Sequence, residues 1–309
     1  MRAVVCTRYG PPEVLQLRDV EQPAPKAKAV LIKIHATTVS SSDCFVRSAI
    51  RSAPFPIQVL MRLMVGTTRP RNPILGLVLA GEIEAAGKAV TRFRVGDRVY
   101  AFTNLHFGSY AQYTCLPERS TIGLAPSKLS YEEAAAIPYG GLLALHFLRK
   151  GNIERARRTL IYGASGAVGT SAVQLAKLAG AEVTAVCGTT NLALVRSLGA
   201  DSVLDYTTQD ALPTRERFDL VFDAVGKRKT SRLKDACRRA LAPGARYISV
   251  DDGMPRVRVS DLALLTEAVE AGKLKPVIDR RYTLEQIVEA HRYVEQGHKR
   301  GNVIVTVRH

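Results

Sequence analysis

The chain has 309 residues, of which 46% are hydrophobic and 23% are charged. This composition suits a globular protein of about two domains and excludes collagen-like and disordered classes. Lys and Arg number 44 against 28 Asp and Glu, a net charge of +16, so anionic ligands, nucleic acid and membrane surfaces are all candidate partners.

The five cysteines are spread along the chain, with no CxxC pair and no cluster of Cys with His. This pattern indicates a reducing compartment and argues against structural zinc. The N-terminal segment MRAVVCTRYG lacks the apolar core and the small-residue cleavage site of a secretory signal. We therefore expect a cytoplasmic protein.

The first third of the chain reads as β-structure. Short apolar or alternating runs predict strands over residues 29–34, 78–85 and 97–102, which should form an antiparallel sheet. Residues 47–73 contain five arginines and four prolines without one clean period, so we interpret them as a long loop with a helical turn or two. His106 is expected in a surface loop. Residues 134–148 are uncharged but shorter than the roughly 18 residues of a spanning helix, which predicts a core segment and no membrane insertion.

From Thr159 the pattern changes to alternating strands and helices. Strands are predicted over residues 159–163, 182–187, 202–204, 218–223 and 245–250, and helices over residues 167–179, 192–198 and 229–240. This alternation predicts a doubly wound parallel sheet. A helix over residues 261–271, a strand over 275–279, a helix over 284–296 and a final strand NVIVTV follow. Because the parallel sheet is then complete, the final strand should return to the first domain.

The strongest chemical signal is a glycine-rich turn between the first of these strands and its helix. Gly166 and Gly169 occupy the second and third glycine positions of a G-x-G-x-x-G turn, and Ala164 occupies the first. The backbone N–H groups of such a turn bind a dinucleotide pyrophosphate at the helix N-terminus. The alternative is a turn that only packs helix on strand. The predicted cofactor-binding residues here are Ala164, Ser165, Gly166, Ala167, Val168 and Gly169.

The end of the second strand bears on the choice of cofactor. An NAD site expects an acidic residue there, whereas this chain has Gly188, Thr189 and Thr190 and no acid between Glu182 and Asp201. Hydroxyl groups could bond a 2′-phosphate, so NADP(H) is favoured over NAD(H). No Lys or Arg lies between residues 188 and 195, so the compensating cation must come from Arg196 or elsewhere. Ligands also bind at the carboxyl ends of the later strands, which adds Ala224, Val225, Gly226, Val250 and Asp251.

An ordered series of segments then carries a family resemblance. RYGPPEVLQL, VLIKIHATTVSSSD, ILGLVLAGEIEAAGKAVTRFRVGDRVYAF, GASGAVG, LGADSVLDY, FDLVFDAVG and AGKLKPVID follow one another nearly end to end. The chain resembles the medium-chain dehydrogenase/reductase superfamily, in particular its zinc-independent quinone oxidoreductase branch. The resemblance implies an α/β protein with a GroES-like domain over residues 1–122, completed by 274–309, and a Rossmann domain over residues 123–273. It also implies a cleft between them for cofactor and substrate, and a homodimer.

The resemblance implies a metal-free enzyme. Zinc-dependent members have G-H-E where this chain has Gly76, Leu77 and Val78, and a Cys where it has Ser40. Cys44 is the nearest thiol, but it has no histidine partner at the family spacing. Without a Lewis acid, an electron-poor acceptor is favoured, so we expect NADPH-dependent hydride transfer to a quinone or an α,β-unsaturated carbonyl.

Other functions stay open at this point. An alcohol or aldehyde dehydrogenase-like oxidoreductase and a non-catalytic NADPH-binding sensor are the alternatives. Nucleic-acid binding is disfavoured because the basic clusters at residues 155–158 and 227–234 contain no aromatic residue.

The resemblance also assigns individual residues. The turn with Ser40, Asp43 and Phe45 lines the cleft beside the nicotinamide, and Tyr139 approaches the nicotinamide edge. Phe45 replaces a tyrosine that is common in quinone reductases, so the final proton has no assigned donor and water is the candidate. Asp43 fits a structural loop role equally well, and Tyr139 fits a core role. Tyr206, Arg300 and Asn302 are the remaining cofactor-binding candidates, with Arg300 as the cation for the 2′-phosphate.

Overall fold

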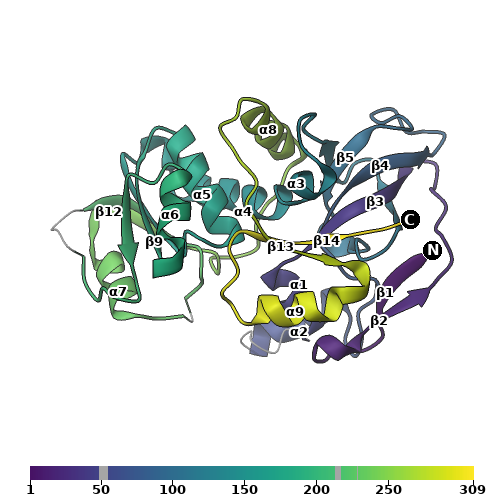
Figure 1. The fold of residues 1–309 in the computed structure, drawn as a ribbon, viewed down its shortest axis with the longest axis horizontal. Helices are drawn as coiled ribbons and strands as arrows, with labels where there is room; N and C mark the ends of the chain where they lie inside the picture. The colour runs from purple at the N-terminus through teal and green to yellow at the C-terminus, as the bar shows by residue number, and fades with distance from the viewer. Residues whose placement is uncertain (49–54, 213–216, 228) are drawn as a thin grey trace. The chain divides into compact units, whose positions relative to one another are not determined.

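The computed structural model describes residues 1–48, 55–212, 217–227 and 229–309. They form two compact units, the first from Met1–Pro138 with Ile278–His309 and the second from Tyr139–Val277 (Figure 1). The first unit thus combines both ends of the chain. The α/β class is confirmed, with a largely antiparallel sheet in the first unit and a parallel sheet in the second.

The first unit is built on a seven-stranded sheet in the order β13-β14-β3-β4-β5-β7, with β6 also paired to β3. These strands are β3 (Ala29–Val39), β4 (Val78–Ala86), β5 (Arg98–Phe102), β6 (Tyr113–Pro117), β7 (Thr121–Leu124), β13 (Ile278–Thr283) and β14 (Asn302–Thr306). The antiparallel pairing predicted for the first third is confirmed. β14 pairs antiparallel with β3, so the chain end returns to the first sheet as predicted.

β3 runs five residues beyond its predicted end at Ile34. The extension contains the polar residues Thr37 and Thr38, which are nevertheless buried. The Thr37 hydroxyl donates to the carbonyl of Val78 at 2.6 Å, so the neighbouring strand satisfies this polar group. When the hydrogen-bond partner of a polar residue lies on another strand, the sequence pattern gives no sign that the residue is buried.

The segment read as a long loop contains a regular helix, α2 (Phe55–Val65). The prediction of a helical turn or two was therefore too short, although residues 49–54 of that segment lie outside the described residues. Pro56 stands in the first helical turn, where a missing N–H costs no hydrogen bond. Pro70 and Pro73 follow the helix end. Prolines that flank a helix were mistaken for prolines that break one.

The remaining elements of the first unit are short. A separate two-stranded ribbon pairs β1 (Arg2–Cys6) with β2 (Leu15–Asp19). The helices are η1 (Pro12–Val14), α1 (Ser41–Arg47), η2 (Asn104–His106), α3 (Tyr131–Ala135), η5 (Leu284–Gln286) and α9 (Ile287–Glu295). His106 is exposed on η2, in agreement with its predicted surface position.

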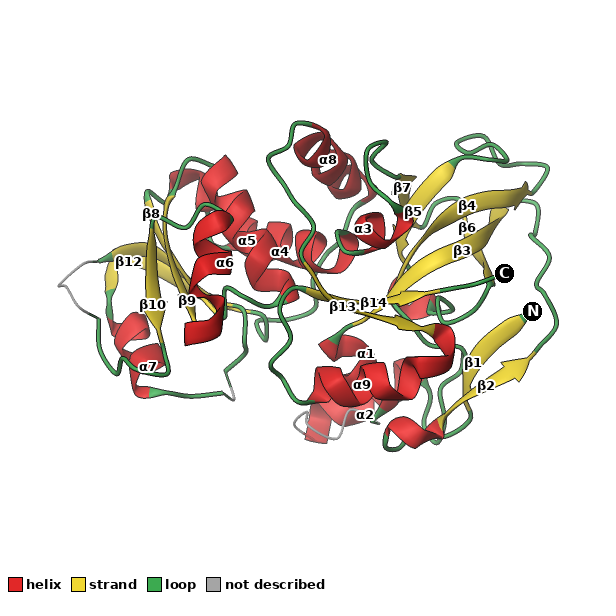
Figure 2. Cartoon of the chain, in the orientation of Figure 1, coloured by secondary structure: helices red, strands yellow, loops and turns green. Residues whose placement is uncertain are grey.

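The second unit contains a parallel five-stranded sheet in the order β10-β9-β8-β11-β12 (Figure 2). Its strands are β8 (Arg158–Tyr162), β9 (Glu182–Cys187), β10 (Ser202–Asp205), β11 (Phe218–Asp223) and β12 (Leu241–Ser249). Its helices are α4 (Pro138–Lys150), η3 (Ile153–Arg155), α5 (Ala167–Leu178), η4 (Thr189–Asn191), α6 (Leu192–Ser197), α7 (Arg232–Arg239) and α8 (Val259–Glu270). The predicted Rossmann-type sheet is confirmed, with the reversal of strand order between β8 and β11.

A continuous core holds one face of this sheet to α7. Leu160, Val186 and Val221 are buried on three neighbouring strands, and Leu233 and Cys237 of α7 pack against the same cluster. The carboxyl edge of the sheet is therefore carried on a packed layer. Along the described residues, no helix is both long and apolar enough to cross a bilayer.

Candidate functional site

The glycine-rich turn leaves β8 and opens α5, as the motif predicts. Gly163 adopts φ +80°, and a Cβ there would come within 2.2 Å of the Val225 side chain. Only glycine tolerates both conditions. The turn therefore begins at Gly163. The sequence prediction, which put the first glycine position of the motif at Ala164, was one residue too late. A glycine directly after an apolar strand was the signal that could have identified it.

The space around Gly166 and Gly169 fits the two purposes that the motif assigns to them. A Cβ on Gly169 would lie 2.1 Å from the carbonyl oxygen of Gly163, so this glycine allows α5 to approach the strand end. A Cβ on Gly166 would meet only that oxygen, at 3.7 Å, and otherwise open space. Gly166 is the N-cap of the twelve-residue α5, and within the described chain no side chain caps that position. The free N–H groups and the open space fit a pyrophosphate.

The hydroxyl residues after β9 have an acidic neighbour that the sequence reasoning missed. The Thr189 hydroxyl donates to Asp205 Oδ2 at 2.5 Å and lies 2.8 Å from the Thr207 hydroxyl. The hydrogen bonds from Thr189 and Thr207 lower the pKa of Asp205, so its carboxylate is ionised near neutral pH. No acid is close to the end of β9 in the sequence, but Asp205 at the end of β10 is close to it in the structure.

Tyr206 follows this acid and is 42% exposed. A Cβ on Gly188 would lie 3.4 Å from its hydroxyl oxygen, so the tyrosine ring stands beside the end of β9. Thr190 is exposed at the same position of the sheet edge. Gly188, Thr189, Thr190 and Tyr206 are thus brought together at one edge of the sheet. Their role at the adenosine end of a cofactor stays a prediction.

The later strands contribute a second cluster at the same sheet edge. The N–H groups of Val225 and Gly226 both donate to Asp223 Oδ1 at 3.1 Å. Asp251 accepts a hydrogen bond from the Lys227 N–H at 2.6 Å, and its carboxylate lies 2.8 Å from the Cβ position of Gly226. Residues 224–226 and 250–251 therefore adjoin one another as predicted. Tyr139, at the start of α4, is buried in this unit.

In the first unit, Ser40 and Asp43 form a capping box at the start of α1. The Ser40 N–H and hydroxyl donate to Asp43 Oδ2 at 2.8 and 2.5 Å, and the Asp43 N–H donates back to the Ser40 hydroxyl. Burial raises the pKa of Asp43 to about 6, against the lowering effect of the hydrogen bonds from Ser40. The structural role that the sequence left open for Asp43 is therefore present in the fold. Phe45 is half-buried on the same helix.

Cys44 has a histidine partner that its sequence neighbourhood does not show. Its Sγ lies 3.4 Å from Nδ1 of His291 on α9. Burial raises the pKa of Cys44 to about 12 and lowers that of His291 to about 3, so both groups are neutral near pH 7. A neutral thiol beside a neutral imidazole is a packed pair and lacks the thiolate of a nucleophilic cysteine. Nothing else in the described chain marks it as a reactive centre.

The last predicted residues divide between the units. Arg300 and Asn302 belong to the first unit with Ser40, Asp43 and Phe45, whereas the glycine-rich turn and Tyr139 belong to the second. Arg300 is exposed, and its N–H donates to Asp279 Oδ2 at 3.0 Å, while Asn302 is buried on β14. Across the described residues, no three His, Cys, Asp or Glu side chains are grouped to hold a metal ion.

Comparison with known proteins supports this two-part architecture. The family described as "Alcohol dehydrogenase GroES-like domain" matches residues 26–126, and "Zinc-binding dehydrogenase" matches residues 167–265, with a second model of that description over 256–305. A 2-methylene-furan-3-one reductase from Solanum lycopersicum is 31% identical over 99% of this chain and 79% of its own length.

Two solved structures share the whole fold. The quinone oxidoreductase from Coxiella burnetii is 27% identical, with a TM-score of 0.82 over 100% of this chain and 99% of its own. An NAD-dependent alcohol dehydrogenase is 28% identical, with a TM-score of 0.85 over 100% of both chains.

Gly166→Ala separates the ligand role of the turn from its packing role. Because the new methyl group has room, we expect the free energy of unfolding to fall by no more than about 1 kcal/mol. The methyl group would stand where the pyrophosphate approaches the backbone, so dinucleotide affinity should fall at least about tenfold. Fluorescence titration with NADPH and NADH and thermal melting provide the two measurements. Gly169→Ala is the contrast, since its collision with Gly163 should destabilise the fold by about 3 kcal/mol. Unchanged affinity for both cofactors in Gly166→Ala would contradict the assignment.

Asp43→Asn should remove a loss of folding stability that the wild type shows between about pH 4 and pH 6. Because burial raises the pKa of Asp43 from 3.8 to about 6, the fold favours its protonated form. Its stabilising contribution is therefore complete below about pH 4 and is lost as the pH rises to about 6. Denaturant unfolding of both proteins should show a difference that changes by about 3 kcal/mol over this range. Asp19→Asn, at an exposed position, is the control and should follow the wild-type profile. If the free energies of unfolding of Asp43→Asn and wild type changed in parallel with pH, the raised pKa of Asp43 would be contradicted.

Proposed function

We propose that this chain, which belongs to the medium-chain dehydrogenase/reductase superfamily and is an oxidoreductase of that family, reduces quinones or α,β-unsaturated carbonyl compounds with NADPH. The observation that carries the proposal is the Gly163–Gly169 turn with its open position at Gly166. Its backbone donors would hold the pyrophosphate without a cationic side chain. When bound, the nicotinamide group supplies a hydride equivalent.

The acceptor class follows from the residues at the zinc-ligand positions of the family. Ser40 and Leu77 stand where zinc-dependent members carry Cys and His, and neither side chain supplies a strong metal ligand. Without a Lewis acid, an acceptor that delocalises its own developing charge is favoured over a simple alcohol or aldehyde. The names of two similar proteins, a 2-methylene-furan-3-one reductase and a quinone oxidoreductase, support the same class.

The side chains of the first unit would orient the reactants. Asp43 fixes the Ser40 hydroxyl through the capping box, which makes Asp43 a positioning residue for Ser40. In this unit we assign Ser40 as a polar contact for the acceptor or the nicotinamide and Phe45 as an apolar wall. For Tyr139 of the second unit we propose a polar contact with the nicotinamide. Phe45 has no proton to give, so water is the proposed source of the final proton.

The direct test follows NADPH absorbance with a panel of quinones, enones and aldehydes, each with and without a chelator. We expect turnover of quinones or enones that is insensitive to chelation. Turnover restricted to aldehydes, or abolished by chelation and restored by zinc, would favour the alcohol dehydrogenase-like alternative. Cofactor binding without turnover of any acceptor would favour a sensor.

The choice between NADPH and NADH depends on Asp205. We propose that the 2′-phosphate binds beside Thr189, Thr190 and Tyr206. Arg300, the cation that the family resemblance implies, belongs to the first unit. The Asp205 carboxylate at Thr189 opposes a phosphate at that position, and a carboxylate beside the end of the second strand is also the group that an NADH ribose would use. This acid is a specific observation in favour of NADH.

Asp205→Asn distinguishes the two cofactors. If the 2′-phosphate binds there, removal of the negative charge should raise NADPH affinity about tenfold and leave NADH affinity nearly unchanged. Isothermal titration with each cofactor measures both values. Asp201→Asn is the control, because Asp201 precedes the same strand at its opposite end and pairs with Lys177. A fall in NADH affinity with no gain for NADPH would instead identify Asp205 as a ribose ligand.

A further inference from the structure

One helix of the first unit presents an apolar face to solvent. Val59, Leu63 and Met64 of α2 are 44%, 55% and 37% exposed. Val59 and Leu63 are one helical turn apart and therefore share a face. The other large apolar side chains that the structure describes as exposed are scattered over the chain. Three such residues within six positions form a local patch of the kind that marks an interaction site.

The charge of the same segment is of one sign. Residues 44–81 contain five arginines and no Lys, Asp or Glu. Arg69 and Arg71, in the loop after α2, are both exposed. Arg71 Nη2 donates to the carbonyl oxygen of Leu63 at 2.7 Å, so a guanidinium group lies against the backbone of the most exposed of these three apolar residues. Apolar and cationic groups are therefore adjacent.

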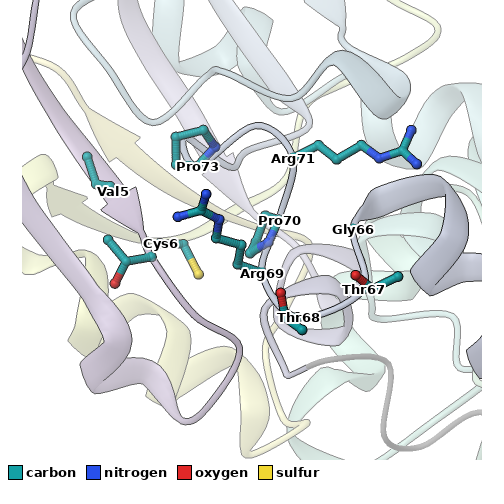
Figure 3. A pocket seen from close by; sticks show the side chains of 10 residues that line it. Val5, Cys6, Gly66, Thr67, Thr68, Arg69, Pro70, Arg71 and Pro73 are labelled. Atoms are coloured by element: carbon teal, nitrogen blue, oxygen red, sulfur yellow. The ribbon is translucent and has the colours of Figure 1, made fainter.

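A cavity of about 650 Å³ adjoins this loop. It lies between the end of β1, at Val5, Cys6 and Thr7, and residues 66–71 with Pro73. Figure 3 shows the Arg69 side chain extending between Cys6 and Pro73, whereas Arg71 points the other way. Arg69 has no hydrogen-bond or ion-pair partner among the described residues. Threonine hydroxyls and an unpaired guanidinium around an open cavity suit a phosphate group.

We propose that Val59, Leu63 and Met64 together with Arg69 and Arg71, here called the α2 surface, dock the protein on an anionic phospholipid bilayer. Interfacial helices place apolar side chains at the acyl boundary and cations among the headgroup phosphates. The α2 surface offers both kinds of group and no acid. A second copy of this chain is a poorer occupant, because a two-fold contact would bring the same arginines together. Docking is independent of the proposed reaction, since vesicle binding requires no turnover.

The test is flotation of the full chain with vesicles of phosphatidylcholine alone and of an equal mixture of phosphatidylcholine and phosphatidylglycerol. We expect binding to the mixed vesicles that weakens as salt is raised, and little binding to phosphatidylcholine. Leu63→Ser should weaken binding about tenfold. The double variant Arg69→Gln with Arg71→Gln should weaken it about 25-fold, or roughly fivefold for each arginine.

Two matched variants keep the test specific. Leu124→Ser changes a leucine of 56% exposure elsewhere in the unit, and Arg94→Gln with Arg119→Gln removes the same charge from other exposed positions. Both should bind vesicles like the wild type, and thermal melting checks that all variants are folded. Equal losses in test and control variants would overturn the proposal. So would binding of inorganic phosphate without binding of vesicles, or a dimer in solution that Leu63→Ser dissociates.

Discussion

The carboxyl edge of the parallel sheet depends on one buried carboxylate. Asp223, at the end of β11, is fully buried and accepts hydrogen bonds from two backbone N–H groups, from the Tyr247 hydroxyl at 2.8 Å and from Lys234 Nζ at 2.8 Å. Lys234 is itself buried and also donates to the carbonyls of Gly226 and Lys229. A buried charge without its partner costs about 3–5 kcal/mol, so this pair fixes α7, β12 and the turn at Gly226 as one piece. Among the positions predicted to line a dinucleotide, residues 224–226 are held by this pair and do not form a free loop.

The second unit could be predicted almost completely because its signals are local. Each strand is an apolar run, each helix follows at the expected distance, and the glycine-rich turn stands at their junction. The first unit was predicted less well, since its elements depend on contacts between distant segments. The end of β3 is polar and is buried only because β4 and β14 pair with it. α2 is framed by prolines, and composition alone cannot show whether prolines flank a helix or interrupt it.

The same distinction separates the parts of the site that sequence could find from those it could not. The backbone donors of the turn are contiguous and were identified, apart from Gly163. Three contacts could not be predicted from the sequence, because the residues in each are far apart along the chain. They are Thr189 with Asp205, Cys44 with His291, and Asp223 with Lys234, which are separated by 16, 247 and 11 residues. No periodicity links such residues. The acid that bears most on cofactor choice thus became visible only when two adjacent strand ends were placed side by side.

The basic residues behind the positive net charge differ in their surroundings and therefore in what they can do. A pyrophosphate bound by backbone N–H groups needs few cations, so the cofactor accounts for little of a net charge of +16. Part of the basic complement is neutralised inside each unit, as where Arg47 is buried against Glu295 and Arg149 pairs with Asp261. Arg69 and Arg71 differ, because they are exposed in a segment without acids and Arg71 lies against the backbone of the exposed Leu63. Scattered charge would serve solubility equally well at any position. Positive charge beside an exposed apolar helix face is instead typical of surfaces that bind the interface of an anionic membrane.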